Sequence, residues 1–170
     1  VDLHVRQGDI YGLIGRSGAG KTTILKMISG LAAPTAGDFS LFGKTGKQAA
    51  PCMSRIGTLI EAPGLYLNMT AEENLKMKCL AMGIREEDTV SRLLKIAGLS
   101  QAGKKKVRNY SLGMKQRLGI ALALVGNPDL VILDEPINGL DPQGIAEIRE
   151  TLYYLNREHQ ITFLISSHIL

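Results

Sequence analysis

The sequence lacks the features that assign many proteins to a class at once. It has only two cysteines, Cys52 and Cys79, and they match neither a metal-binding spacing nor a disulfide framework. This low cysteine content favours a reduced compartment. No stretch reaches the roughly 18 uncharged apolar residues that a membrane-spanning helix needs. The charge excess is small, 20 Lys and Arg against 16 Asp and Glu, so charge alone indicates neither nucleic acid nor membrane as a partner.

Length and composition favour one globular domain. The chain has 170 residues, of which 45% are apolar, enough to bury a core and too many for a disordered chain. Its 19 glycines follow no three-residue period, which excludes a collagen-like protein. The first residues are charged and alternate, unlike a secretory signal peptide. The chain begins at Val1 rather than Met and stops two residues after His168, so we expect a piece of a longer polypeptide.

Short apolar runs predict strands, and apolar residues at helical spacing predict helices between them. Strands are expected at 1–5, 10–14, 39–42, 56–60, 130–133 and 161–165. Helices are expected at 21–29, from a capping box at 70–73 to Gly83, and at about 90–97, 114–125 and 142–159. Continuous apolar strands separated by helices are typical of a parallel sheet covered on both faces. We therefore predict an α/β core, residues 1–64 and 127–170, with a helical insertion at 65–126.

The first chemically informative segment is a glycine-rich turn after the strand at 10–14. It reads Gly15-Arg16-Ser17-Gly18-Ala19-Gly20-Lys21-Thr22 and matches G-x-x-x-x-G-K-[ST] between a predicted strand and a predicted helix. Backbone N–H groups of such a loop, with the helix N-terminus, bind phosphate oxygens. Lys21 would reach the β- and γ-phosphates, Thr22 would offer Mg²⁺ a hard oxygen, and Thr23 would add a phosphate contact. The motif predicts a nucleoside-triphosphate site.

Two further apolar strands also end in polar residues. Asp134 and Glu135 follow the run at 130–133, and Ser166-Ser167-His168 follows the run at 161–165. In parallel α/β sheets, ligands bind at the carboxyl ends of the strands, so these residues are expected at the site of the glycine-rich turn. One carboxylate there would hold Mg²⁺ through water, and the second would polarise an attacking water. Taken alone, His168 would more often be a structural histidine at a strand end.

Four segments, in this order and spacing, resemble the ATP-binding-cassette (ABC) ATPases. Residues 110–118 resemble the family's signature segment, 133–136 its Asp-Glu strand end, 138–142 its D-loop, and 166–168 its switch-histidine segment. The resemblance implies an α/β P-loop NTPase core with a mostly parallel sheet and an inserted helical subdomain. It implies that Glu135 and His168 are catalytic, that Asp134 and Thr22 hold Mg²⁺, and that Asp141 belongs to the D-loop. The signature residues would act in trans on ATP held by a second subunit: Ser111, Leu112, Gly113, Met114, Lys115 and Gln116.

Departures from the commonest family pattern resemble one branch of it. Leu112 and Met114-Lys115 interrupt the usual Gly-Gly-Gln run, and Glu61 stands where most members carry Gln. These variants, with the segment 68–75, resemble bacitracin- and lantibiotic-efflux ATPases. The resemblance implies that Glu61 serves both as a metal ligand and in a loop that couples to a membrane partner. The family's adenine-stacking aromatic residue lies well upstream of the glycine-rich turn, and only fourteen residues precede Gly15 here.

The resemblance as a whole implies an ATP-binding transporter subunit. ATP and Mg²⁺ would be its cofactors, and its partners would be a transmembrane permease and a second copy or paired cassette, with no nucleic acid. It would lie on the cytoplasmic face of a bacterial cell membrane and drive export of a peptide antibiotic or similar compound. One alternative is a non-transport ABC ATPase acting on DNA or the ribosome. Another is a P-loop kinase or GTPase, against which residues 111–117 and His168 argue.

Overall fold

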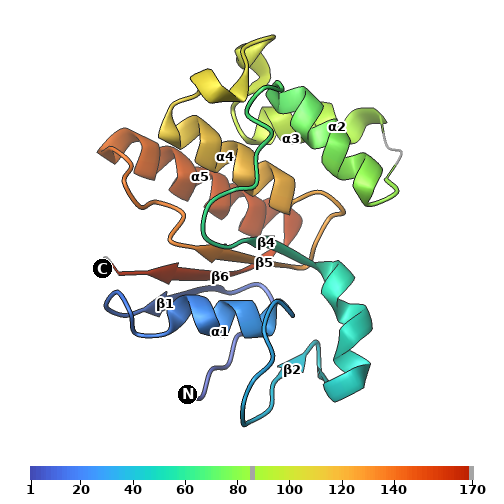
Figure 1. Ribbon diagram of the computed structural model, residues 1–170, viewed down its shortest axis with the longest axis vertical. Coiled ribbons are helices and arrows are strands. Elements are labelled where there is room, and N and C mark those ends of the chain that lie inside the picture. The colour runs from blue at the N-terminus through green and yellow to red at the C-terminus, as the bar shows by residue number, and fades with distance from the viewer. Residues whose placement is uncertain (85–86, 169–170) are drawn as a thin grey trace.

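The structure, a computed structural model, describes residues 1–84 and 87–168 (Figure 1). The described elements, with 3-10 helices labelled η, run in this order: β1 (Ile10–Ile14), α1 (Lys21–Ile28), β2 (Ser40–Leu41), β3 (Lys44–Thr45), η1 (Gly46–Arg55), β4 (Ile56–Leu59), α2 (Ala71–Ala81), α3 (Glu87–Ile96), η2 (Ser100–Ala102), η3 (Val107–Asn109), α4 (Leu112–Ala123), β5 (Leu130–Asp134), α5 (Pro142–His159) and β6 (Thr162–Ser167). None of the helices in these described ranges combines the length and the apolar character that a bilayer span requires.

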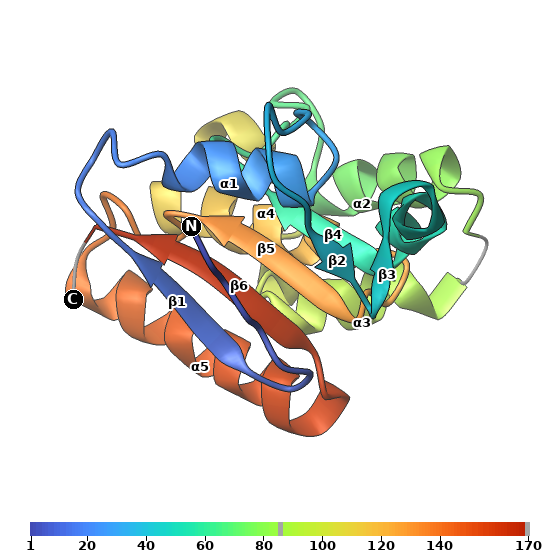
Figure 2. The same cartoon turned by 90° about the horizontal axis from the view of Figure 1, so that it is seen from below.

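The main sheet has four strands in the order β1-β6-β5-β4, and every pairing in it is parallel. Helix α1 covers one face, while α4 and α5 cover the other (Figure 1). Seen from below, the strands lie side by side and α5 runs along β1 and β6 (Figure 2). The predicted α/β class is therefore confirmed. A small antiparallel pair, β2 and β3, lies beside this sheet.

Apolar side chains on the two faces of the sheet form separate clusters. Under α1, Leu25 packs with Ile132 and Leu164, all of them buried. On the other face, one continuous cluster joins the sheet and α5 to the helices α2, α3 and α4, which lie between β4 and β5 in the chain. Phe163 of β6 and Leu75 of α2 belong to that same cluster. The helical segment thus shares its core with the sheet.

Local capping signals place several helix ends where the sequence predicts them. The Thr70 side chain accepts a hydrogen bond from Glu73 N–H, and the Glu73 carboxylate accepts one from Thr70 N–H. The backbone bond from Thr70 lowers the pKa of Glu73 below its ordinary value, because it stabilises the charged carboxylate. Helix α5 begins with Asp141 as the cap and Pro142 in the first turn, and it ends at His159. The expected capping box and the expected span 142–159 are confirmed.

Two local expectations are wrong, and one helix was not predicted. Residues 1–5 form no strand: Leu3 and Val5 pack under the sheet beside α1, but this segment pairs with no described strand (Figure 2). The alternating pattern arises because every second side chain, at Leu3 and Val5, faces the core, and the segment belongs to no described sheet. The strand expected at 39–42 shrinks to Ser40–Leu41, because it pairs only with the two residues of β3. The unpredicted helix is η1 at 46–55, which packs the buried Ala49 and Cys52 against Leu41.

A close approach between β4 and α4 requires glycine at position 57. A Cβ built on Gly57 would lie 1.9 Å from the carbonyl oxygen of Ala123, which is backbone and cannot rotate away. The lack of a side chain therefore sets the distance between the sheet and α4. Because α4 carries the residues that follow Ser111, the same contact fixes the position of that segment over the sheet.

We expect Gly57→Ala to lower the free energy of unfolding by about 3 kcal/mol, because an overpacked core must shift its backbone. The measurement is urea unfolding followed by circular dichroism. Gly12→Ala on β1 is the control, since a Cβ there meets only the Ile14 side chain, at 3.9 Å. That control should change stability by no more than about 1 kcal/mol. Equal losses in the two variants would contradict the close approach.

Candidate functional site

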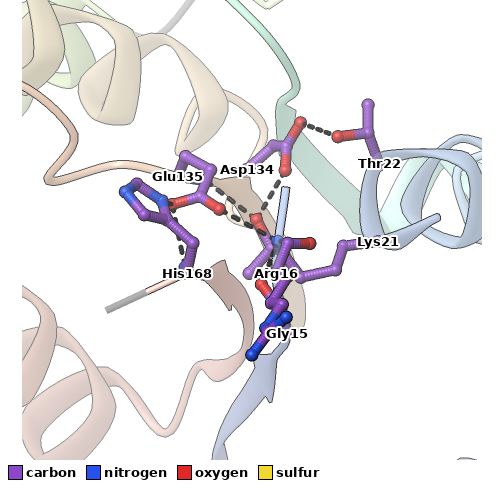
Figure 3. A network of polar contacts seen from close by, with 8 residues as sticks. Gly15, Arg16, Lys21, Thr22, Asp134, Glu135 and His168 are labelled. Carbon is purple, nitrogen blue, oxygen red and sulfur yellow. Dashed lines mark hydrogen bonds and ion pairs between the residues drawn. The ribbon is translucent and has the colours of Figure 1, made fainter. Parts of the chain in front are cut away.

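The carboxyl ends of β1, β5 and β6 bring the predicted site residues together (Figure 3). Parallel pairing sets Asp134 of β5 directly opposite Ser166 of β6. Gly15, which follows β1, donates its N–H to the carbonyl of Ser167 over 3.1 Å. Three segments far apart in the chain are thus fixed at one edge of the sheet.

The loop from Gly15 to Gly20 curls tightly before α1 begins. Gly18 and Gly20 have φ angles of 79° and 90°, a left-handed conformation that residues with a side chain rarely adopt. Gly20 stands at the N-cap of α1, where no side chain caps the first turn. The first N–H groups of α1 therefore remain available to an anion, and the helix dipole favours negative charge there.

Lys21 folds back over this loop. Its side chain is largely buried, and Nζ donates to the carbonyl of Gly15 at 2.6 Å and to that of Arg16 at 3.2 Å. The same atom lies 3.3 Å from Oε1 of Glu135. The ammonium is thus held by loop carbonyls and one carboxylate, at the mouth of a loop whose N–H groups attract anions.

Asp134 lies between two hydroxyl donors. Thr22 Oγ1 donates to its Oδ2 over 2.7 Å, and Ser166 Oγ donates to its Oδ1 over 2.5 Å (Figure 3). The Thr22 and Asp134 oxygens form a pair of hard ligands, the kind that Mg²⁺ prefers. Within residues 1–84 and 87–168 there is no cluster of three or more His, Cys, Asp or Glu side chains that would cage a metal. Two protein oxygens suit Mg²⁺, which commonly takes its other ligands from water and substrate phosphates.

Glu135 is held in an unusual backbone conformation. Its φ of 48° is left-handed, which is uncommon for a residue with a side chain and often marks a functional site. Its Oε2 lies 2.7 Å from Nδ1 of His168, while Oε1 faces Lys21. The carboxylate therefore joins the glycine-rich loop to the histidine after β6.

Glu61 lies at the end of β4 and takes part in a different contact. Its carboxylate forms an ion pair of 2.5 Å with Nζ of Lys26 on α1, and its own φ is 63°. Both side chains are substantially exposed to solvent. No hydrogen bond or ion pair given for the described residues joins Glu61 to Asp134 or Thr22. Its role as a metal ligand stays a prediction.

Residues 111–116 form the N-cap and the start of helix α4, which lies on the opposite face of the sheet from α1 (Figure 1). Ser111 caps the helix by accepting from Met114 N–H over 3.2 Å, and the half-exposed Leu112 lies against Gly139. Gln116 is buried, and in the described part of the chain its carbonyl oxygen has no hydrogen-bond partner. Asp141 accepts from Gly144 N–H over 3.0 Å and so caps α5.

The tyrosine just before this segment is also buried. Burial raises the pKa of the Tyr110 phenol above its ordinary value, so it remains protonated at neutral pH.

Two residues of this region, Ser166 and Lys26, were not predicted individually from the sequence. Ser166 was noted only as part of a strand end, although it bridges Asp134 and Glu135. A polar residue inside a buried strand, beside a neighbouring strand that ends in carboxylates, is the signal that would have found it. Lys26 carried no signal for its pairing with Glu61, because only the packing of α1 beside β4 brings the two together.

Comparisons with known proteins give a consistent result. The family model described as ABC transporter matches residues 1–138. The bacitracin transport ATP-binding protein BcrA of Bacillus licheniformis is 50% identical over the whole chain, which spans 56% of that protein's length. The lantibiotic transport ATP-binding protein SrtF of Streptococcus pyogenes is 44% identical, and the chain covers 72% of it. The chain therefore spans little more than half of the bacitracin relative.

Solved structures agree in fold. One is the ATP-binding cassette MJ0796 in a dimeric post-hydrolysis state bound to ADP and Pi, with a TM-score of 0.84 and 28% sequence identity. The match covers 99% of this chain and 78% of the MJ0796 chain. Another is the ADP conformation of MJ1267, an ATP-binding cassette of an ABC transporter, with a TM-score of 0.87 and 28% sequence identity. The match covers 100% of this chain and 74% of the MJ1267 chain.

The exposed pair between Glu61 and Lys26 should contribute little to stability. We expect Glu61→Gln and Lys26→Gln each to lower the free energy of unfolding by less than about 1 kcal/mol, because solvent screens such pairs. The double variant should lose no more than either single variant, since all remove one interaction. Urea unfolding checks this. A loss above about 2 kcal/mol in either single variant would mean that the pair holds the loop after β4 in place.

Proposed function

Because this chain belongs to the ABC transporter family, we propose that it binds and hydrolyses ATP as the nucleotide-binding subunit of a transporter. One observation carries the proposal: the Thr22 hydroxyl and the Asp134 carboxylate meet at 2.7 Å beside the glycine-rich loop. A phosphate-binding loop and a pair of hard oxygen ligands in contact are what a magnesium-nucleotide complex requires.

The loop residues would bind the phosphates of ATP. The backbone of 15–20 leads directly into the N-terminus of α1, and Thr23 follows in the first turn of that helix. The side chains of Arg16 and Ser17 would add contacts to the phosphates. Lys21 already faces a carboxylate, which shows that its ammonium accepts an anionic partner at this point. A phosphate oxygen would replace Glu135 as that partner, because a phosphate carries more negative charge and more acceptor atoms.

Thr22 and Asp134 would hold Mg²⁺ between them. The metal supplies positive charge that offsets the charge building up on the phosphates. Glu61 would serve as a third ligand only after leaving Lys26, to which it is paired in the structure. Thr22 would turn its hydroxyl from Asp134 toward the metal, so that both oxygens face it.

Glu135 would orient and deprotonate the attacking water. When Lys21 moves to a phosphate, Oε1 of Glu135 loses its cationic neighbour and becomes free to accept a proton. His168, 2.7 Å from Oε2, would hold the carboxylate and also contact the γ-phosphate. The Glu135 carboxylate already lies beside Lys21 of the glycine-rich loop, where the attacking water would be activated.

A second subunit would complete each site. The N-terminal end of α4, with Ser111 to Gln116, belongs to the helix on the opposite face of the sheet from α1 and would contact the ATP of a partner (Figure 1). Leu112 packs on Gly139, so the signature segment and the D-loop that ends at Asp141 would move together. One structural relative is a dimer with ADP and Pi, which supports a homodimer or a pair of cassettes.

A groove beside α2 is the candidate docking surface for a permease. It lies between the loop after β4, with Pro63 and Tyr66, and the helices α2 and α4. Tyr66 and Met77 are partly exposed at its rim, 55% and 39% respectively, and Lys78 also lines it. The loop that forms one wall begins at Glu61, so a partner bound here would act on the segment next to α1.

Export of a peptide antibiotic of the bacitracin or lantibiotic type is the proposed physiological role. Relatives with those transport names are 44% and 50% identical, and both come from bacteria. The subunit would bind a permease at the cytoplasmic face of the cell membrane, with no nucleic acid as partner. ATP would favour a closed dimer and hydrolysis would release it, which drives the permease between two states.

We expect Lys21→Ala to abolish tight binding of ATP by the complete protein, because a charge-assisted contact to phosphate is lost. Equilibrium binding of a fluorescent, non-hydrolysable ATP analogue measures this, with at least a tenfold rise in Kd. Lys47→Ala is the matched control, since Lys47 is exposed on η1. Wild-type affinity in the Lys21 variant would contradict the assignment of the phosphate-binding loop.

Glu135→Gln should bind ATP as tightly as wild type and lose nearly all hydrolysis, because the amide keeps the shape and loses the basicity. With ATP and Mg²⁺ it should accumulate as a dimer, seen by size-exclusion chromatography with light scattering. In cells that also produce the permease, it should fail to confer resistance to the exported antibiotic.

Two outcomes would count against the mechanism. Hydrolysis at the wild-type rate in Glu135→Gln would assign the base to another residue. Wild-type protein that hydrolyses ATP, yet confers no resistance and binds no permease in membranes, would support a non-transport ATPase instead.

A further inference from the structure

Ser166 makes two hydrogen bonds that join consecutive carboxylate residues of the neighbouring strand. Its hydroxyl donates to Oδ1 of Asp134 over 2.5 Å and accepts from the backbone N–H of Glu135 over 2.9 Å. Ser166 is completely buried, and its position on β6 is opposite Asp134 in the parallel register. The hydroxyl thus uses both its donor and an acceptor lone pair on the end of β5.

The first bond fixes the orientation of the Asp134 carboxylate. In the structure, Thr22 holds one carboxylate oxygen and Ser166 holds the other. If Thr22 turns its hydroxyl toward Mg²⁺, the bond from Ser166 to Oδ1 would remain. That bond would hold the carboxylate in place and so keep its other oxygen, Oδ2, directed at the metal. Hydrogen bonds of this kind around a ligating carboxylate typically change metal affinity by about 10–100-fold.

The second bond supports the unusual backbone of Glu135. A left-handed φ of 48° persists only where the surroundings favour it, and the bond from Glu135 N–H to Ser166 is such a contact. This conformation lets the Glu135 side chain reach both Lys21 and His168. One hydroxyl therefore determines where two neighbouring carboxylates point.

We propose that Ser166 is a positioning residue that orients Asp134 toward Mg²⁺ and Glu135 toward the attacking water. The proposal rests on the ATPase function proposed above. In this role Ser166 would act through the two carboxylate residues that it bonds, not by contact with nucleotide or metal. An apolar residue would fill a buried strand position equally well, so the hydroxyl is explained by the two bonds it makes.

The test compares Ser166→Ala with Ser166→Thr in the complete protein. The control is Thr162→Val, which removes a buried hydroxyl on the same strand, where Thr162 accepts from Gly8 N–H over 2.9 Å. Three quantities are measured: hydrogen exchange of the Glu135 amide without ligand, the Mg²⁺ concentration needed for binding of a non-hydrolysable ATP analogue, and kcat and KM for ATP.

Ser166→Ala should speed exchange of the Glu135 amide and raise the required Mg²⁺ concentration about tenfold. It should lower kcat about tenfold or more, with a much smaller change in KM for ATP at saturating Mg²⁺. Ser166→Thr keeps the hydroxyl and should restore all three quantities. Thr162→Val should leave all three at wild-type values and speed exchange only at Gly8.

Three results would overturn the proposal. In the first, Ser166→Ala exchanges faster at Glu135 but keeps wild-type Mg²⁺ dependence and kcat, which makes the bonds purely structural. In the second, Thr162→Val shows the same losses, which makes them an effect of stability. The third result applies if Ser166→Ala does not fold. Ser166→Cys then replaces it, because cysteine has a similar volume and a weaker donor. Wild-type values of all three quantities in Ser166→Cys would overturn the proposal. Wild-type protein without ATPase activity would instead reject the proposed function, while the exchange data still report on the ligand-free contacts.

Discussion

Parallel hydrogen bonding between β5 and β6 is the constraint on which the rest of the site depends. It sets Asp134 opposite Ser166 and brings Glu135 within reach of the residue that follows β6. Because β1 pairs with β6 in the same direction, the glycine-rich loop emerges at the same edge. A shift of one residue between these strands would turn Ser166 to the opposite face of the sheet and separate the carboxylates from their donors.

The polar groups at this edge of the sheet balance one another. Lys21 is paired with Glu135 and with loop carbonyls, and Asp134 accepts from two hydroxyls. A buried charge without a partner is costly, so this arrangement lets the fold tolerate charge at the sheet edge. The proposed magnesium-nucleotide complex would therefore replace existing contacts, and its affinity would reflect the difference between the old partners and the new ones.

The helical segment is tied to the sheet by close backbone contacts rather than by a flexible connection. Gly57 lets α4 approach β4, and a Cβ on Gly119 of α4 would lie 2.8 Å from Pro63 in the loop after β4. That loop also begins with Glu61, which is paired with Lys26 on the helix that follows the glycine-rich loop. A displacement of this loop at Pro63 would therefore reach α1 through the pair between Glu61 and Lys26.

The sequence by itself determined the features that depend on neighbours in the chain. The glycine-rich loop, the capping box at Thr70 and the helix 142–159 follow from local hydrogen bonding and backbone preference, so a pattern of a few residues suffices. Only the tertiary structure decided the pairing of Glu61 with Lys26 and the two bonds of Ser166, because their partners are 31 to 35 residues away and meet through strand register and helix packing. It also decided that residues 1–5 form no strand. Alternation marks which side chains face a core, but a strand exists only where another backbone supplies the hydrogen bonds.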